Sequence, residues 1–482
     1  MLSMASRPLG LRQINLLSLA IILAFIYILF FAHLREGYLW PFDYQPPWRP
    51  TSDTHPAPET PPVVELPPEY QHKPTDNTWC LERYGTKYLT NARDLPVSYC
   101  KPQSAANITC FWSQTAGDRR DAMCYAGAAS YDASQKKFRL GCGLVDMSDQ
   151  DKTVPRFPDD LPIYWYETGP GFIVAENVEL DENIPAAPAN RTSILVKREG
   201  SQNPWHSLLE IMSMSWSLDI LQIAVDDTTN KPYLDPESGG NTTQIVLLDQ
   251  HDDGPYIDLW RMFAKMPVRY IKDLGPDEPP SNLVIPFSGG SNTLWQGDWD
   301  VMNCRDGALL RTFTDRALEH YDIPTPEPQE IVSVTYIQRT NTRKLLNETE
   351  HIDSLRGIPH ISLEVVDFEK LTFPRQLDVV RRTDVLVGVH GAGLAHMLFL
   401  RPGSVIVEIQ PEGFHHQGFR NVAQLMDVGY FRTHAELQEQ SHDSDDRWQM
   451  EAVRVRPDKF FDIVDMAVKS IYNRAGRSFD AL

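Results

Sequence analysis

The stretch DVLVGVHGAGLAHMLFLRPGSVIVEIQP, residues 384–411, decides the fold class. An apolar, β-branched run leads into HGAG, an apolar helical stretch follows, and a second β-branched run closes the segment. Strand, glycine-rich turn, helix and strand in this order are typical of a parallel α/β unit. Glycines at such a turn let the backbone approach a ligand, and the N–H groups of the helix start favour phosphate. The sequence therefore predicts a ligand site around His390 and Gly391, at the carboxyl end of a strand.

The glycine spacing differs from that of a dinucleotide-binding fold. Gly388, Gly391 and Gly393 give G-x-x-G-x-G, whereas the dinucleotide fingerprint is G-x-G-x-x-G. An acidic residue about 20 residues on, at the end of a second strand, usually binds the ribose, and Glu408 is the nearest candidate. A tight strand-to-helix turn with a capping histidine is the alternative explanation of this cluster.

Strand and helix patterns alternate on both sides of the decisive stretch. The first half predicts strands at 193–198, 244–249 and 282–287 and helices at 205–224 and 256–263. The second half predicts strands at 331–338, 361–368, 384–389 and 404–409 and helices at 373–382 and 457–475. The chain is therefore predicted to be an α/β protein with two Rossmann-like domains facing across a cleft.

The domain organisation follows from these halves and from the composition. We expect an N-terminal Rossmann-like acceptor domain at residues 151–325 and a C-terminal domain at 326–440. Residues 441–482 add a strand and a last helix, which we expect to pack back across the first half. The formal net charge is −20, so general attraction to nucleic acid is excluded.

The amino-terminal residues predict a membrane anchor and a stem. Residues 14–34 are apolar over a length that spans a bilayer and lack a small-residue cleavage site. Arg7 and Arg12 precede them, so the tail at 1–13 is expected in the cytosol and the bulk of the chain in the lumen. Eleven prolines between residues 41 and 75 predict an extended stem at 35–75.

Cysteines and glycosylation sequons favour the same compartment. Five of the six cysteines fall within residues 76–150, which predicts a disulfide-rich module that Cys304 can close onto, and 15 pairings stay open. Unpaired buried thiols are the alternative. The disulfide candidates are Cys80, Cys100, Cys110, Cys124, Cys142 and Cys304. The N-x-[ST] sequons, which are glycosylated only in the secretory pathway, are Asn107, Asn190, Asn241 and Asn347.

Taken whole, residues 384–411 resemble glycosyltransferase family 61, in which a hydrophobic strand is followed by HGAG, an apolar helix and a PGS-hydrophobic-E-hydrophobic segment. VTYIQRTNTRKLLN at 334–347 and NPWHSLLE at 203–210 are similar to two further segments of the family. IPFSGGSNTLWQGDW at 285–299 looks like a loop of the branch that contains the EGF-domain-specific O-GlcNAc transferases. The resemblance extends over about residues 75–435.

The resemblance implies an inverting glycosyltransferase of GT-B type, which uses a UDP-sugar and binds no metal or other cofactor. GlcNAc or xylose would pass to a hydroxyl of a glycoprotein or glycan, in a single-pass type II protein of the Golgi or endoplasmic reticulum membrane. The implied nucleotide-sugar-binding residues are Arg339, Arg343, His390, Gly391, Ala392, Gly393 and Glu408.

The residue types fit these roles. Arg339 and Arg343 lie four apart and can present two guanidinium groups to a diphosphate, although a solvated basic face has the same spacing. Glu408 can accept hydrogen bonds from a ribose, or it is an ordinary acid at a strand end. Inversion needs one general base, and His206 and Glu210 share a helix face, one as base and the other as its orienter. A helical histidine satisfied within the core is the alternative.

Two rival functions remain. The D-x-D triplets begin at Asp149, Asp298 and Asp443, and a metal-dependent transferase would use Asp298 and Asp300 to bind Mn²⁺. We assign no metal to the adjacent His415 and His416, which we expect in a loop near the nucleotide. The second rival is a lumenal sugar- or nucleotide-binding protein without catalytic activity.

Overall fold

The computed structural model describes residues 64–70, 75–436, 452–473 and 478–481, apart from residues 118, 149, 151, 186, 238 and 328–329. The predicted tail, the anchor at 14–34 and most of the stem lie outside the described residues. Within the described part of the chain, no helix is both long and apolar enough to cross a membrane. Residues 152–154 excepted, the described residues belong to one unit of an α/β fold.

The first sheet is mixed and has nine strands. Its parallel part has the order β11-β6-β9-β10, and β3 continues it in the antiparallel sense through β2 to β1. The strands expected at 193–198, 244–249 and 282–287 are confirmed as β6, β9 and β11. The strands are β1 (Pro96–Ser98), β2 (Ile108–Ala116), β3 (Arg119–Asp132), β4 (Lys137–Leu140), β5 (Val178–Leu180), β6 (Thr192–Val196), β9 (Thr243–Leu247), β10 (Arg269–Tyr270) and β11 (Ser281–Ile285).

The predicted cysteine-rich stretch supplies the antiparallel part of this sheet. Strands β1 to β4 all come from residues 76–150, and β3 pairs directly with β11. A separate two-stranded ribbon consists of β7 (Val225–Asp226) and β8 (Lys231–Pro232). The cysteine-rich stretch and the first α/β stretch therefore share one hydrogen-bonded sheet.

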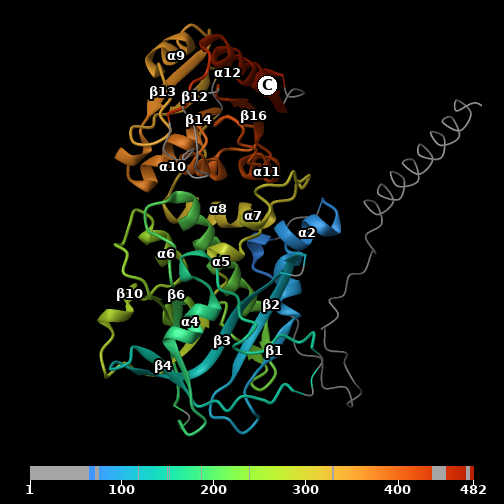
Figure 1. The fold of residues 1–482 in the computed structure, drawn as a ribbon, viewed down its shortest axis with the longest axis vertical. Helices are drawn as coiled ribbons and strands as arrows, with labels where there is room; N and C mark the ends of the chain where they lie inside the picture. Colours follow the sequence, from blue (N-terminus) through green and yellow to red (C-terminus); the bar gives the residue numbers. More distant parts are fainter. Residues whose placement is uncertain are drawn as a thin grey trace, which may run out of the picture. The chain divides into compact units, whose positions relative to one another are not determined.

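The second sheet has six parallel strands in the order β13-β12-β14-β15-β16-β17. Every residue of β14 and β15 is buried, as expected for central strands of a parallel sheet covered on both faces. Figure 1 shows helices α9, α10, α11 and α12 around it. The strands are β12 (Val332–Ile337), β13 (Ile361–Val366), β14 (Val385–Val389), β15 (Val405–Gln410), β16 (Gly429–His434) and β17 (Ser478–Ala481).

The helix α5 (Pro204–Ile223) is the central helix of the core. Asn203 caps its start, with the side chain accepting from the Trp205 N–H at 3.0 Å, and Pro204 occupies the first helical position. Nearly all its side chains are buried, which fits its apolar sequence. One hydrophobic cluster contains residues of α5 and of η7 (Ala392–Phe399), so a continuous core joins the elements of the two sheets.

The remaining helices connect or cover the strands. The helices predicted at 256–263 and 373–382 are confirmed as α6 and α10. The α-helices are α2 (Thr78–Tyr84), α3 (Lys87–Arg93), α4 (Pro170–Asn177), α6 (Ile257–Phe263), α7 (Thr293–Gln296), α8 (Ala308–His320), α9 (Glu348–Leu355), α10 (Phe373–Arg382), α11 (Gly418–Leu425) and α12 (Pro457–Tyr472). The 3₁₀ helices other than η7 are η1 (Pro68–Tyr70), η2 (Trp165–Glu167), η3 (Gly239–Thr242), η4 (Ile271–Asp273), η5 (Gly289–Ser291) and η6 (Phe368–Lys370).

The expected packing of the last helix across the first half is wrong. Phe460, Ile463 and Val464 of α12 belong to a cluster with residues of β12, β14 and β15 and with α9, on the second sheet. This placement buries the apolar stripe of the helix against a parallel sheet, which needs helices on both faces.

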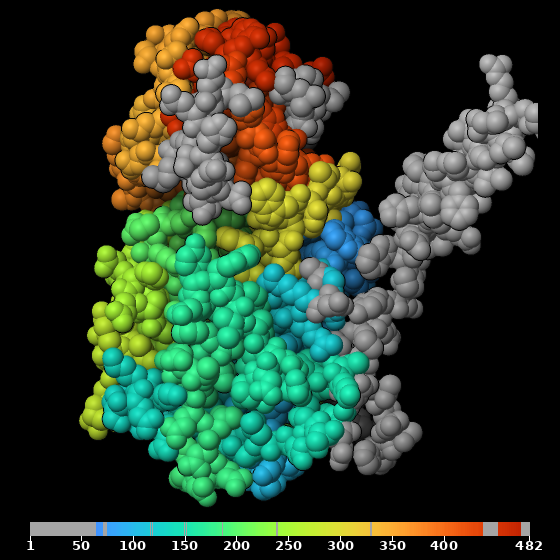
Figure 2. Space-filling view, viewed as in Figure 1, coloured from blue at the N-terminus to red at the C-terminus, as the bar shows by residue number. Residues whose placement is uncertain are grey.

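All six cysteines form disulfides. The pairs are Cys80–Cys304, Cys100–Cys142 and Cys110–Cys124, so Cys304 does close onto the amino-terminal cysteines as expected. The Cys110–Cys124 bond joins β2 to β3, and Cys100–Cys142 links the segments that follow β1 and β4. The third ties α2 to a segment 224 residues further along the chain, and Figure 2 shows the blue α2 region beside the yellow residues near 300.

Candidate functional site

The second sheet reverses its winding direction between β12 and β14. The first strand of this half, β12, lies between β13 and β14, which is the arrangement that defines a topological switch point. Open α/β sheets bind their ligands outside the carboxyl ends of the strands at such a point. Arg339 follows β12, and His390 and Gly391 follow β14. The predicted nucleotide residues therefore gather where the topology favours a ligand.

His390 is held by a buried carboxylate. Its Nδ1 lies 2.5 Å from Glu408 Oε1, and the Tyr430 hydroxyl donates to Glu408 Oε2 at 2.5 Å. Burial alone would raise the pKa of Glu408, but the hydrogen bond and charge of His390, together with Tyr430, lower it. Burial lowers the pKa of His390 despite its carboxylate partner. An ionised Glu408 can only accept, so a neutral His390 carries its proton on Nδ1.

This arrangement favours a positioning role for Glu408 over the expected contact with a ribose. The side chain is fully buried, and each of its oxygens accepts a hydrogen bond from a protein group. A buried carboxylate of this kind fixes the tautomer and orientation of a histidine. Tyr430 comes from β16, beside β15 in the sheet, and no local sequence pattern points to it.

Arg339 and Arg343 converge on Gly391. A Cβ atom at Gly391 would lie 2.3 Å from Arg339 Nη1 and 2.9 Å from Arg343 Cζ, so only glycine leaves room for both guanidinium groups. Thr342 holds the Arg339 side chain through its carbonyl at 3.0 Å and its hydroxyl at 2.9 Å. Burial and repulsion from Arg339 lower the pKa of Arg343 to about 10. An anion between these guanidinium groups would offset that repulsion.

Ala392 and Gly393 begin the helix η7. Gly391 has φ 152°, a conformation that glycine adopts readily, and the 3₁₀ helix starts at the next residue. The Gly393 carbonyl accepts from His396 Nδ1 at 2.8 Å, which fixes the first turn. The predicted helix after HGAG is therefore present, as a 3₁₀ helix.

The parallel part of the first sheet has its own switch point, between β6 and β11. Glu199 follows β6, and Gly289 follows β11. A Cβ atom at Gly289 would lie 3.2 Å from Glu199 Oε1 and 2.8 Å from Glu210 Cγ, so these groups pack closely at the carboxyl ends of the strands. The predicted catalytic helix α5 starts at the same place, which brings His206 to this second site.

His206 pairs with Glu199 rather than with Glu210. His206 Nδ1 lies 2.6 Å from Glu199 Oε2, and the side chains are 20% and 1% exposed, respectively. A carboxylate that accepts from Nδ1–H leaves Nε2 as the basic nitrogen of the ring. The structure therefore replaces the expected His206–Glu210 couple with a histidine–carboxylate pair from two elements.

Glu210 holds the backbone of Glu199 in place. Its Oε1 accepts the backbone N–H of Glu199 at 2.6 Å, and the side chain is buried. Burial, and then the charge of Glu199, raise the pKa of Glu210 well above 4.5. Burial therefore favours the protonated form of Glu210, and its hydrogen bond to the Glu199 backbone positions Glu199.

Aromatic contacts connect the two sites. The Trp205 ring lies 5.5 Å from the Phe419 ring, and Phe419 lies 5.3 Å from His390. His416, predicted near the nucleotide, lies 5.0 Å from His390, and its Nε2 is 3.2 Å from Asp298 Oδ2. The start of α5 and the HGAG turn are therefore linked through one shared phenylalanine ring.

The D-x-D triplets do not cluster as metal sites in the described residues. Asp149, Asp151, Asp443 and Asp445 lie outside the described residues. Asp298 is held by His416, and its carbonyl accepts from the Gln417 N–H at 2.6 Å. These contacts give Asp298 a role in fixing its loop.

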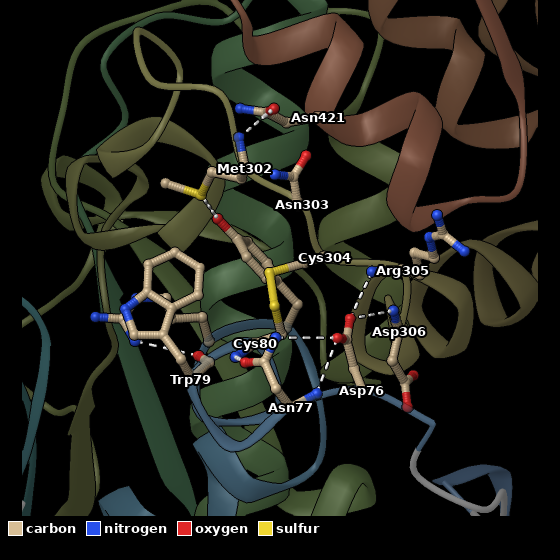
Figure 3. The surroundings of a disulfide bond; sticks show 12 residues. Asp76, Asn77, Trp79, Cys80, Met302, Asn303, Cys304, Arg305, Asp306 and Asn421 are labelled. Carbon is tan, nitrogen blue, oxygen red and sulfur yellow. Dashed lines mark hydrogen bonds between the residues drawn. A yellow bond between two sulfur atoms is a disulfide. The ribbon is translucent and has the colours of Figure 1, made fainter. Parts of the chain in front are cut away.

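The segment from Gly297 to Asp306 is fixed at both ends. Asn421 accepts the Met302 N–H at 3.0 Å and donates to the Asp300 carbonyl at 2.8 Å. Figure 3 shows the other end, where the Cys80–Cys304 disulfide lies beside Asp76, whose carboxylate accepts the Arg305 N–H at 2.5 Å. The disulfide therefore anchors the segment that carries Asp298.

Asp76, Cys80 and Cys304 are also the single group with metal-like spacing that the described residues contain. Their sulfur atoms are joined in the disulfide of Figure 3 and cannot act as thiolate ligands. The Asp76 carboxylate is occupied by backbone N–H groups of the neighbouring segment. This group is structural.

The four sequon asparagines are all exposed, which is the placement that glycosylation requires. They lie in different regions of the fold, at Asn107, Asn190, Asn241 and Asn347.

Known proteins resemble the segment that carries the arginines and the HGAG turn. The family model described as Glycosyltransferase 61 matches residues 295–407, which contain the arginines and the HGAG turn. A Drosophila melanogaster EGF domain-specific O-linked N-acetylglucosamine transferase is 27% identical over 49% of this chain and 44% of its own. The Gallus gallus protein of that name is 33% identical over 34% of this chain and 32% of its own. The Xenopus laevis protein is 34% identical over 23% of this chain and 22% of its own.

These matches support a glycosyltransferase. In particular, the chain resembles glycosyltransferase family 61 over the segment that carries Arg339, Arg343 and the HGAG turn. The chain spans less than half the length of these relatives. Among solved structures, one match is a flavo di-iron protein variant from Thermotoga maritima. It is 7% identical, with a TM-score of 0.21 over 78% of this chain and 99% of its own, and this is too dissimilar to indicate a shared fold.

Proposed function

We propose that the chain is an inverting glycosyltransferase that transfers GlcNAc or xylose from a UDP-sugar to a hydroxyl of a glycoprotein or glycan. The convergence of Arg339 and Arg343 on Gly391, at a topological switch point, carries this proposal. Two buried guanidinium groups beside a glycine that admits no side chain suit a diphosphate. The similarity of this segment to sugar transferases supports a nucleotide sugar as the donor.

The donor site would act mainly by stabilising the leaving group. The bond between the anomeric carbon and the diphosphate breaks, and UDP leaves with the bonding electron pair. Arg339, Arg343 and the N–H groups at the start of η7 would stabilise the developing charge without a metal. His390, oriented by Glu408 and Tyr430, would hydrogen-bond the donor from the same turn.

The acceptor site would be the His206–Glu199 pair. Nε2 of His206 takes the proton of the acceptor hydroxyl while its oxygen forms a bond to the anomeric carbon, on the face opposite UDP. Glu199 stabilises the imidazolium that forms, and Glu210 holds Glu199 in place. A single displacement of this kind inverts the anomeric configuration.

We also propose that the two sheets serve as the facing domains of a GT-B type enzyme in the secretory pathway. Each sheet has a switch point with polar groups at its carboxyl edge, one for the acceptor and one for the nucleotide. Three disulfides and four exposed sequons fit the lumen of the Golgi or endoplasmic reticulum, with the segment at 14–34 as a type II anchor.

The test is UDP release by the full-length chain from a panel of UDP-sugars, with and without EDTA. We expect release from one sugar that EDTA leaves unchanged and that both Arg339→Ala and His390→Ala abolish. Arg382→Ala, an exposed arginine of α10 paired with Asp378, is the matched control and should behave like the wild type.

Two outcomes would contradict the proposal in different ways. Loss of activity with EDTA, restored by Mn²⁺, would establish a metal-dependent transferase that uses Asp298 and Asp300. Binding of UDP or sugar without turnover of any donor would instead identify a binding protein without catalytic activity.

A further inference from the structure

A strained turn carries exposed aromatic side chains next to the proposed base. Trp165 and Tyr166 are 56% and 63% exposed, well above the exposure usual for residues of this size. Tyr166 and Glu167 have φ values of 58° and 55°, in the left-handed region that non-glycine residues rarely adopt. Strain of this kind persists where the surrounding structure enforces it, and it gathers at functional sites.

The surrounding structure does enforce this turn. The Tyr164 N–H donates to the Thr168 carbonyl at 2.8 Å, and the Thr168 hydroxyl donates to the Trp165 carbonyl at 2.9 Å. The Tyr164 hydroxyl donates to Asp121, which is buried on β3. Because Tyr164 anchors the turn to β3 and the hydrogen bonds of Thr168 close it, the backbone that carries the exposed rings is fixed.

The rings of this turn frame the imidazole of His206. The centroid of Trp295 lies 4.7 Å from that of His206 and 5.6 Å from that of Trp165. The centroid of the Tyr166 ring lies 6.1 Å from that of His206. We name Trp165, Tyr166 and Trp295 the aromatic platform. It comes from two segments about 130 residues apart in sequence, which the fold brings together around one histidine.

Resting on the function proposed above, we infer that the aromatic platform binds a sugar ring and that the acceptor is a neutral glycan. A pyranose has an apolar C–H face, which packs on aromatic rings, and a rim of hydroxyl groups. A sugar ring stacked on the platform lies next to His206, so one of the sugar's hydroxyl groups faces Nε2 of the imidazole. The acceptor oxygen is therefore one of the sugar's hydroxyl groups.

The charges around the platform favour a neutral sugar. Glu167 pairs with Lys197 at 3.3 Å, so the edge of the turn carries balanced charges that can hydrogen-bond hydroxyl groups. The chain as a whole has a formal net charge of −20, which repels acidic glycans. A peptide acceptor without sugar would use the same rings only if an apolar side chain stood beside its hydroxyl, and the test includes such peptides.

The experiment measures binding of neutral oligosaccharides to the full-length chain saturated with UDP, by calorimetry. The probes are manno-, xylo-, chito- and galacto-oligosaccharides, with sugar-free Ser/Thr peptides of mixed sequence alongside. We expect one series of sugars to bind, and Trp165→Leu and Tyr166→Leu each to weaken it roughly 3- to 10-fold. Tyr166→Phe keeps the ring and should bind normally. Tyr472→Leu is the matched control, because Tyr472 is 61% exposed on α12.

The outcomes separate this inference from the proposed function. Sugar binding that Trp165→Leu weakens, in a chain that turns over no UDP-sugar, would support the platform and contradict the transferase. Normal donor turnover with sugar binding unchanged in both Leu variants would overturn the platform and leave the transferase intact. Binding of the sugar-free peptides alone would also overturn it.

Discussion

Gly391→Ala should weaken nucleotide binding while leaving the sheet intact. Gly391 is the residue at which β14 turns into η7, with φ 152° and ψ 176°, a region occupied almost only by glycine. The added methyl group would point at the two guanidinium groups, 2.3 Å from Arg339 Nη1 and 2.9 Å from Arg343 Cζ. Either the backbone or both arginines must move.

The magnitude follows from these two effects. The backbone conformation alone costs about 1–3 kcal/mol for a residue other than glycine, and this lowers the free energy of unfolding. Displacing one guanidinium removes at least one charge-assisted hydrogen bond to the diphosphate, worth about 1.5–3 kcal/mol. The affinity for UDP should therefore fall by roughly 10- to 100-fold.

Calorimetric titration of UDP into the full-length chain measures this loss, with circular dichroism to confirm folding. Gly275→Ala is the matched control, because Gly275 lies outside both proposed sites and no heavy atom lies within 4 Å of a Cβ atom at that position. Its UDP affinity should change by less than about threefold. Equal affinities for the wild type and a folded Gly391→Ala chain would refute the diphosphate site.

Three further predictions concern the acceptor site and the disulfide that anchors its loop. Glu199→Gln removes the carboxylate that orients His206, so kcat should fall roughly 10- to 100-fold at an unchanged Kd for UDP; a kcat equal to wild type would exclude the pair as the base. Burial raises the pKa of Glu210 above 4.5, so its stabilising contribution is complete below about pH 4.5 and is lost as the pH rises toward the folded value. Melting curves should therefore show Glu210→Gln gaining on the wild type from pH 5 to pH 8, and parallel curves would contradict the protonated state. The double variant Cys80→Ala with Cys304→Ala opens a link of 224 residues and should lower the free energy of unfolding in urea by about 2–5 kcal/mol, whereas an unchanged midpoint would show that Asp76 alone anchors the segment.

The sequence by itself determined the elements that carry the sites. Hydrophobic periodicity located the strands β6, β9, β11, β12, β13, β14 and β15 and the helices α5, α6, α10 and α12 to within a few residues. It failed for β16 and α9, whose sequences GYFRTH and ETEHIDSL are rich in polar residues. A buried parallel strand is apolar at nearly every position, so its signal is local and readable without knowledge of its neighbours.

The candidate nucleotide residues were also accessible from sequence, because the HGAG turn and the arginines each follow a strand. The convergence of the arginines on Gly391 could not be predicted from the sequence, since it depends on β12 and β14 being adjacent in the sheet. Strand order is a property of the tertiary structure, and no local pattern specifies it.

The partner of His206 was decided by the tertiary structure alone. The helical spacing pointed to Glu210, whereas the fold places Glu199 against the imidazole, from the end of a neighbouring strand. Glu199, like Glu408, is an acid at the carboxyl end of an apolar strand, and this is the sequence signal that points to it. Tyr430, the aromatic platform and the choice among 15 disulfide pairings likewise required the fold. These contacts join residues distant in sequence, and their geometry exists only after the chain has packed.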